Sequence, residues 1–237
     1  MALPKLGYPT YELELPSTGK TVKYRPFLVK EEKVLLLALE SQDEKQVLAA
    51  VKDLIKNCVI SRIKVENLPS FDLEYLFLKI RAASIGENIV LTVTCLDDNE
   101  TTVEANVNID EVEVFKPEGH DKKIMFDDDS GIIMNYPSMK QFVEREFLQK
   151  EMKTDEIYAF IADSIDQIFQ GEDVYDNSTT TKKEFREFVD NLTTKQFEKI
   201  QIFYSTCPKL SHKFTVTNPN TGKESEYTIE GLANFFG

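Results

Sequence analysis

The segment Leu15–Ser41 constrains the fold more than any other part of the chain, because it joins a turn, a strand and a helix with almost no loop between them. Residues 16–20, Pro-Ser-Thr-Gly-Lys, are typical of a tight turn in which Gly19 adopts a positive φ. Apolar residues alternate with polar ones on both sides of this turn, at Tyr11, Leu13, Leu15, Val22 and Tyr24. The pattern predicts a β-hairpin.

An amphipathic helix is predicted directly after the returning strand. Pro26 has no N–H group and is expected at a strand end or edge. Glu31 and Glu32 would lie in the first helical turn, where the helix macrodipole favours carboxylates. We expect the buried face of this helix to be formed by Val34, Leu35, Leu37, Ala38 and Leu39.

Residues Gly19, Lys20 and Thr21 are similar to the end of a nucleotide-binding loop. Such a loop requires a glycine at position 14, which is Glu14 in this chain. It also requires a helix N-terminus after the lysine to bind the phosphate, whereas the pattern here predicts a strand. A plain hairpin turn is therefore the preferred interpretation.

Composition limits the classes of function that the chain can have. Its 237 residues, 41% of them hydrophobic, suffice for one large domain or two small ones. No apolar run approaches about 18 residues, and the first residues lack an apolar signal core, so we expect neither membrane insertion nor secretion. The net charge of −13 divides into +3 for residues 1–64 and −16 for residues 65–237. Such an acidic body repels nucleic acid, and it serves either solubility or docking onto basic partner surfaces.

Hydrophobic periodicity predicts an α+β fold, with several antiparallel hairpins packed against helices and a second half that is mostly helical before a terminal hairpin. We expect two lobes, residues 1–117 and 118–237. The first would contain the hairpin and helix described above, a helix that a capping box over Ser41–Glu44 opens and that continues to Cys58, a helix over residues 71–84, and a second hairpin over residues 89–109.

The second lobe would begin with a hairpin over residues 123–136 that turns at Asp129–Gly131, and four helices would follow. The expected apolar residues of these helices are Phe142, Val143, Phe147 and Leu148 after a cap at Ser138; Ile157, Tyr158, Phe160, Ile161, Ile165, Ile168 and Phe169 after Thr154; Phe185, Phe188, Val189 and Leu192 after Thr181; and Phe197, Ile200, Ile202 and Phe203 after Thr193 or Thr194. The aromatic stripes are either core or a partner groove, and core is preferred. Residues 171–178 would form an acidic loop. A hairpin around residues 218–223 and a short helix with Leu232, Phe235 and Phe236 would end the chain.

The sequence shows no arrangement of residues that indicates catalysis or metal binding. Cys58, Cys95 and Cys207 are far apart, and an odd number of cysteines without secretion favours reduced thiols. His120 and His212, the only histidines, are expected to be exposed or structural. Asp127, Asp128 and Asp129 form either a cation site or an acidic turn, and the spacing of a calcium loop is absent. We therefore expect no catalytic residues, no cofactor and no metal.

Three stretches of the chain resemble one known family. They are Leu15–Ser41, with Arg25-Pro-Phe-Leu-Val-Lys-Glu-Glu-Lys33 at its centre; Phe71–Glu87, followed by Val93-Thr-Cys95; and Tyr204–Leu210, together with Ile229–Phe236. In these stretches the chain resembles T4-like bacteriophage baseplate hub proteins and hub-assembly factors, which are tail proteins of contractile-tailed phages. The resemblance touches the beginning, middle and end of the chain. It implies a component of the hub or a factor needed for hub assembly.

One feature departs from the pattern of that family, in which the terminal hairpin often carries cysteine pairs that resemble a zinc knuckle. Here the turn is Asn218-Pro-Asn-Thr-Gly222, and only Cys207 lies nearby in sequence. Cys207 and His212 cannot supply the four ligands of a structural zinc site. We expect this hairpin to be held by turn chemistry and packing.

The resemblance implies a non-enzymatic structural protein of the baseplate hub region, located in the virion tail and assembled in the host cytoplasm. Two alternatives remain: an assembly chaperone that the virion does not retain, and a tail enzyme that hydrolyses peptidoglycan. The expected partners are other baseplate or tail proteins, with no nucleic acid and no membrane insertion; the oligomeric state stays open. The first hairpin presents either an ordinary solvated face or a partner-binding face, to which we assign Tyr8, Tyr11, Lys20, Lys23 and Arg25. Lys23 and Arg25 would share one face of the returning strand, opposite Val22 and Tyr24.

Overall fold

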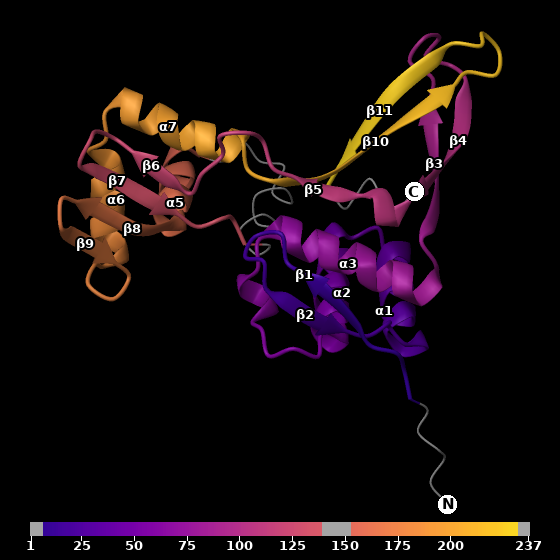
Figure 1. Cartoon of the computed structure of the whole chain (residues 1–237), viewed down its shortest axis with the longest axis horizontal. Helices are drawn as coiled ribbons and strands as arrows, with labels where there is room; N and C mark the ends of the chain where they lie inside the picture. Colours follow the sequence, from indigo (N-terminus) through magenta and orange to yellow (C-terminus); the bar gives the residue numbers. More distant parts are fainter. Residues whose placement is uncertain (1–6, 139–152, 232–237) are drawn as a thin grey trace, which may run out of the picture. The chain divides into compact units, whose positions relative to one another are not determined.

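The computed structural model describes residues 7–138 and 153–231, and its chain divides into two compact units (Figure 1). The first unit comprises Met1–Phe115 together with Lys209–Gly237, and the second comprises Lys116–Pro208. Each unit has its own buried apolar residues and is described by itself. No helix within the described ranges is both long enough and apolar enough to cross a membrane.

The first unit begins with the elements that the sequence predicts. Strands β1 (Tyr11–Glu14) and β2 (Thr21–Tyr24) pair antiparallel as the first hairpin, with Leu13 opposite Val22. Because Thr21 starts a strand directly after the turn, the hairpin interpretation of Gly19 and Lys20 is confirmed. The helices that follow are α1 (Val29–Glu40), α2 (Glu44–Cys58) and α3 (Ser70–Ile85). Two single-turn 3₁₀ helices, η1 (Val65–Asn67) and η2 (Ile109–Glu111), lie in the connections.

Helix α3 forms the centre of the first unit. Apolar residues around its circumference are buried, namely Phe71, Leu73, Leu76, Phe77, Leu78 and Ile80. A helix that is apolar on all sides requires neighbours on all sides, and α2, β5 and β10 pack around α3. The carboxylate of Asp72 in its first turn accepts hydrogen bonds from the backbone N–H and the hydroxyl of Ser17. This contact fixes the first hairpin turn onto α3, and burial raises the pKa of Asp72.

Two further sheets complete the first unit. Strands β3 (Asn88–Thr94) and β4 (Thr102–Asn108) form the predicted second hairpin. The other sheet has the order β11-β10-β5 and contains β5 (Glu113–Phe115), β10 (Lys209–Thr217) and β11 (Glu224–Glu230). Leu210 of β10 lies opposite Val114 of β5. The terminal hairpin therefore belongs to the first unit, whereas the division expected at residue 117 placed it in the second lobe.

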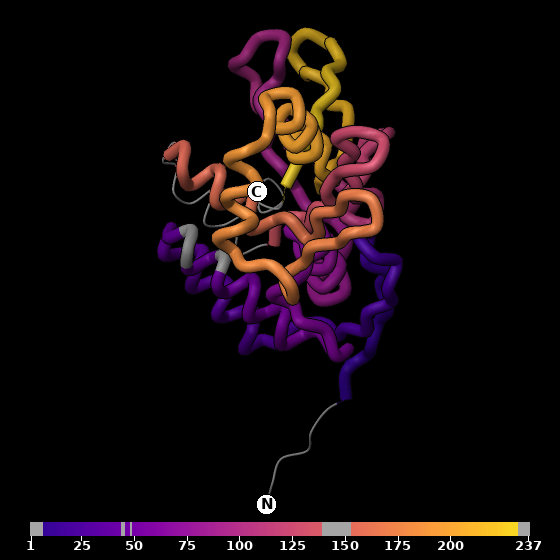
Figure 2. The backbone as a smooth tube through the Cα atoms, turned by 90° about the vertical axis from the view of Figure 1, so that its left-hand side faces the viewer, coloured from indigo at the N-terminus to yellow at the C-terminus, as the bar shows by residue number. Residues whose placement is uncertain are grey.

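The tips of the β3–β4 and β10–β11 hairpins lie side by side in both views (Figures 1 and 2). The side-chain amide of Asn218 donates hydrogen bonds to the carboxylates of Asp97 and Asp98, both at 2.9 Å. The Thr221 hydroxyl donates to Asp97 at 2.5 Å, and the Tyr227 hydroxyl donates to the carbonyl of Thr94 at 2.7 Å. These bonds are the turn chemistry and packing that hold the terminal hairpin, and we call them the tip joint.

The second unit is a four-stranded antiparallel sheet with helices. Its sheet has the order β6-β7-β8-β9, formed by β6 (Lys123–Met125), β7 (Ser130–Met134), β8 (Ile165–Gln170) and β9 (Asp173–Asp176). Its described helices are α5 (Thr154–Ser164), α6 (Lys182–Asp190) and α7 (Thr194–Ser205). Thr181 and Thr193 cap α6 and α7 by accepting from the backbone N–H groups of Glu184 and Gln196.

The fold-class prediction is wrong for the second half of the chain, which is not mostly helical. The helix expected from Thr154 to Phe169 ends at Ser164, and Ile165 starts β8. The expected acidic loop contains β9, whose Val174 lies opposite Phe169. The isoleucines at 161, 165 and 168 fit a helical period, but β-branched residues also favour strands, and pairing with β7 decides the outcome.

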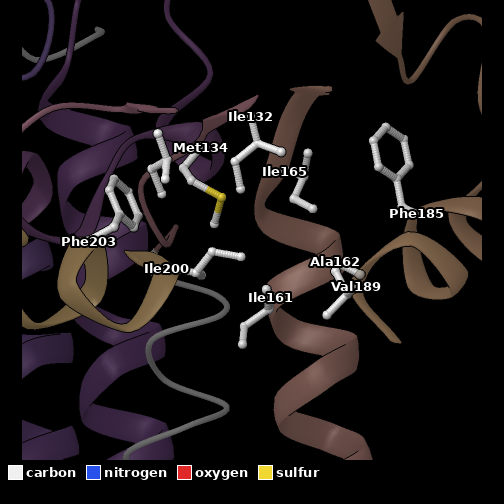
Figure 3. Packing of buried hydrophobic residues seen from close by; sticks show 10 residues of the cluster. Ile132, Met134, Ile161, Ala162, Ile165, Phe185, Val189, Ile200 and Phe203 are labelled. Carbon is white, nitrogen blue, oxygen red and sulfur yellow. The ribbon is translucent and has the colours of Figure 1, made fainter. Parts of the chain in front are cut away.

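The aromatic stripes of the last two helices are mostly core, as the sequence indicated. Figure 3 shows Phe185 and Val189 from α6 and Ile200 and Phe203 from α7, packed with buried residues of β7, α5 and β8. Ile202 is the exception, because its side chain is exposed. His120 is buried rather than exposed: its ring stacks on Tyr136 and Phe203, and its Nδ1 lies 2.9 Å from the Thr206 hydroxyl.

Two predicted segments cannot be compared with the structure. The helix expected after Ser138 and the terminal cluster both lie outside the described residues; they involve Phe142, Val143, Phe147, Leu148, Leu232, Phe235 and Phe236. The third hairpin is present, but its turn spans residues 126–129 instead of Asp129–Gly131. Asp127 stabilises this turn by accepting from the backbone N–H groups of Asp129 and Ser130, at 2.9 and 2.7 Å.

We predict that Gly131→Ala destabilises the second unit. A Cβ atom at residue 131 would lie 2.3 Å from the carbonyl oxygen of Ile124 and 2.7 Å from the ring of Phe169. A backbone carbonyl within a sheet cannot move away freely, so the free energy of unfolding should fall by about 2 kcal/mol. Chemical denaturation tests this, with Gly7→Ala as the control because a Cβ there meets nothing within 4 Å. Equal stability of both variants would contradict the packing.

We also predict that acid loosens the tip joint. Hydrogen bonds, chiefly from Asn218 to Asp97 and from Thr101 to Asp98, hold the pKa values of both carboxyl groups below their ordinary range. Because these pKa values are lower in the folded protein than in the unfolded chain, the ionised carboxylates stabilise the joint above about pH 4. This stabilisation is lost as the pH falls further. An NMR titration should therefore find Asp97 ionised well below pH 4, and Asn218→Ala should return its pKa toward the ordinary value. An ordinary Asp97 pKa in the unaltered protein would contradict the joint.

Candidate partner-binding surface

The first hairpin is held on the first unit at both of its ends. At the turn, the backbone N–H of Gly19 donates to the carbonyl of Leu15 at 2.8 Å, and Ser17 is bonded to Asp72. At the other end, the backbone N–H of Ile60, after α2, donates to the carbonyl of Lys23 at 2.8 Å. The hairpin therefore presents its remaining side chains from a rigid backbone.

The aromatic side chains of the predicted surface lie at the open end of the hairpin. The ring of Tyr11 stacks on that of Tyr24 at a centroid distance of 5.6 Å, and Tyr8 lies 5.3 Å from the Arg25 guanidinium. Tyr24 is buried, which is the main cause that raises its pKa to about 12. Tyr8 and Tyr11 remain 50% and 40% exposed. The structure thus places two accessible tyrosines over a fixed base, an arrangement suited to contact with another protein.

The expectation that Arg25 shares an exposed face with Lys23 is wrong, because Arg25 is only 7% exposed. Its guanidinium donates to the Glu31 carboxylate at 3.1 Å and to the carbonyls of Pro26 and Asn57 at 2.8 and 2.9 Å. Strand β2 ends at Tyr24, so the alternation on which that expectation rested does not reach Arg25. Arg25 supports Tyr8 from beneath and links three elements of the fold.

Electrostatics around Arg25 are those of a buried ion pair. Burial alone would raise the pKa of Glu31, but hydrogen bonds from Arg25 and from the backbone N–H of Leu28 outweigh it and hold the pKa below its usual range. Burial raises the pKa of the neighbouring Cys58 thiol to about 11. A thiol with such a pKa is protonated at neutral pH and a poor nucleophile. This site is structural.

The predicted lysines lie apart from the tyrosines. Lys23 is opposite Glu12 in the ladder, and the two form an exposed ion pair at 2.9 Å. Since successive side chains of a strand alternate, Lys23 points to the opposite face from Tyr24 and Tyr11. Lys20 is exposed in the turn. The five predicted residues therefore do not form one continuous face: Tyr8 lies over Arg25 and Tyr11 over Tyr24, whereas Lys23 points to the opposite face and Lys20 lies in the turn.

The sequence interpretation missed the exposed face of helix α1. Leu35 and Ala38 are buried as expected, but Val34 and Leu37 are exposed, and Leu36 is exposed beside them. The apolar run Val34–Leu39 surrounds the helix, so only part of it can face the core. That excess of apolar residues over a single helical face was the sequence feature that could have indicated an exposed patch.

Metal-binding residues do not gather anywhere in residues 7–138 and 153–231: no group of three or more His, Cys, Asp or Glu side chains there could hold an ion. Cys58 and Cys95 are buried, and Cys207 is half-buried. His212 lies on β10, with Nδ1 3.3 Å from the carbonyl of Glu111.

Comparison with known proteins relates the chain to one family. A family model described as T4 bacteriophage base plate protein matches residues 8–237. The match includes both units and the terminal hairpin that closes the first one. No curated protein and no solved structure matches the chain.

We predict that Arg25→Glu destabilises the first unit strongly, whereas Lys23→Glu does not. The Arg25 change removes the buried partner of Glu31, leaves it only the exposed Lys30 at 3.4 Å, and adds a like charge beside it, which should cost about 3 kcal/mol or more. Lys23 contributes an exposed pair, so its reversal should change the free energy of unfolding by less than about 1 kcal/mol. Urea denaturation of both variants measures the difference. Similar stability of the two would show that Arg25 is not buried in an ion pair.

Proposed function

The chain belongs to the T4 bacteriophage base plate protein family, and from this we propose that it is a non-enzymatic structural component of the baseplate hub region of a contractile-tailed phage. The supporting observation is the extent of the match, from residue 8 to residue 237. The matched region includes both compact units, so the resemblance is not confined to one of them. The protein would be built into the tail from the host cytoplasm.

Docking onto other baseplate proteins would use the first hairpin. Tyr8 and Tyr11 combine accessible ring area with a rigid base, because Arg25 and Tyr24 beneath them are buried. Tyrosine supplies a large contact area at a small entropic cost. Lys20 and Lys23 add two exposed basic side chains, of which Lys23 is paired with Glu12, on the part of the chain that carries net positive charge. This combination suits a partner surface with apolar hollows and acidic residues nearby.

The acidic remainder of the chain supports the same role. Residues 65–237 carry a net charge of −16, which favours docking onto basic partner proteins and opposes contact with phage DNA. The protein would therefore bridge two kinds of neighbour, an acidic one at the hairpin and basic ones elsewhere.

Mass spectrometry of purified virions and of tail intermediates tests this role. We expect the protein in both, at a constant ratio to other baseplate proteins. Presence in intermediates and absence from finished virions would support an assembly chaperone instead. A purified protein that lowers the turbidity of a peptidoglycan suspension would support the hydrolytic alternative.

We predict that Lys20→Glu with Lys23→Glu reduces incorporation into tails while the protein stays folded. Tyr8→Ala with Tyr11→Ala should do the same independently, because it removes the aromatic contact and keeps the charge. The control is Lys182→Glu with Lys183→Glu, which reverses two exposed lysines on α6. Complementation of a phage that lacks the gene, followed by counting plaques and tails, measures the effect. Normal yields with both hairpin variants would leave the hairpin as an ordinary solvated face.

A further inference from the structure

The outer side of helix α1 carries apolar side chains in an unusual position. Val29, Leu36 and Leu37 are 80%, 52% and 55% exposed. Lys33 and Glu40 are exposed on the same side. Spacings of three, four and seven residues place these five side chains along one line of the helix; we call this line the α1 seam.

The neighbouring helix α2 shows a different pattern. Helix α2 buries its apolar residues Val51, Leu54, Ile55 and Cys58. On α1, Glu31, Leu35 and Ala38 are the buried residues that face the unit. The seam residues therefore do not contribute to its core. Exposed apolar side chains gathered along one side of a helix indicate an interaction surface.

The charges of the α1 seam follow an order that complements itself. Lys33 precedes the two leucines by three residues, and Glu40 follows them by three residues. Neither Lys33 nor Glu40 forms an ion pair with any residue that the structure describes. When a second α1 runs antiparallel about a two-fold axis between Leu36 and Leu37, Leu36 faces Leu37 of the other copy and Lys33 faces Glu40. Both unpaired charges then gain an opposite charge, twice per pair of helices.

We propose that the α1 seam binds the α1 seam of a second copy of this chain, as an antiparallel two-fold helix pair. A two-fold interface requires a self-complementary surface, and the order of basic, apolar and acidic residues on α1 provides one. Any other partner would have to present basic, apolar and acidic residues in the opposite direction along its surface. A second, antiparallel α1 already presents them in that direction. The inference does not depend on the proposed baseplate role.

The interface is small, since one helix of 12 residues contributes most of it. Stable complexes usually bury about 1,600 Å² in total, and a single helix pair buries less. The dissociation constant of the dimer should therefore lie between about 1 μM and about 1 mM.

Sedimentation equilibrium of the full chain over that range tests the proposal. The unaltered protein should shift from monomer to dimer as its concentration rises, and Leu37→Glu should remain a monomer. Lys33→Glu alone and Glu40→Lys alone should each weaken association by about tenfold, because each places like charges opposite one another twice. The double variant Lys33→Glu with Glu40→Lys should restore association to within about twofold. Because Lys33, Leu37 and Glu40 are all exposed, these variants should keep the circular dichroism spectrum and melting temperature of the unaltered protein.

The control is Ile202→Glu, which changes an equally accessible apolar side chain on α7 and should dimerise normally. Three results would overturn the proposal: a protein that is monomeric at all concentrations, dimers that persist in Leu37→Glu, or a double variant that fails to restore association. A monomeric protein whose Leu37→Glu variant loses tail incorporation would assign the α1 seam to a different protein.

Discussion

The buried ion pair between Arg25 and Glu31 joins three elements on which the rest of the first unit depends. Arg25 follows β2, Glu31 lies in the first turn of α1, and the Asn57 carbonyl that also accepts from Arg25 lies near the end of α2. The backbone N–H of Arg25 donates to the carbonyl of Cys58 as well, at 3.0 Å. Because an unpaired buried charge is costly, the strand exit and both helix ends are positioned together. The support of Tyr8 and the orientation of the α1 seam follow from that arrangement.

The closure of the first unit depends on strands that are distant in sequence. Phe115 in β5 lies opposite Lys209 in β10, so the chain leaves and re-enters the first unit at adjacent positions. A compact unit can be inserted at such a point because its two ends need to be close together. The entropic cost of the long connection grows only slowly with its length. The tip joint adds a second contact between the N-terminal and C-terminal parts of this unit.

The candidate surface shows which structural features the residue pattern of a single strand or helix can predict. Alternation in β2 correctly predicted buried Val22 and Tyr24 and exposed Lys23. It failed at Arg25, one residue beyond the strand, because the partner that buries this side chain comes from α1 and from the end of α2. The same limit applies to α1, where the apolar run predicted a helix correctly but could not show which of its sides faces the unit. Both errors concern contacts between elements, which the local pattern does not contain.

The sequence by itself indicated the family to which the chain belongs, through three separate stretches. It also determined the short-range features: the first hairpin and its turn, the three helices of the first unit and the cap at Thr181, whereas it left the cap of α7 between Thr193 and Thr194. These depend on periodicity, turn residues and capping groups within a few positions of one another. Only the tertiary structure decided that Ile165–Gln170 is a strand, that β10 pairs with β5, and that Arg25 is buried. In each case two local conformations or environments are compatible with the residues, and the free energy of pairing with a distant segment selects one of them.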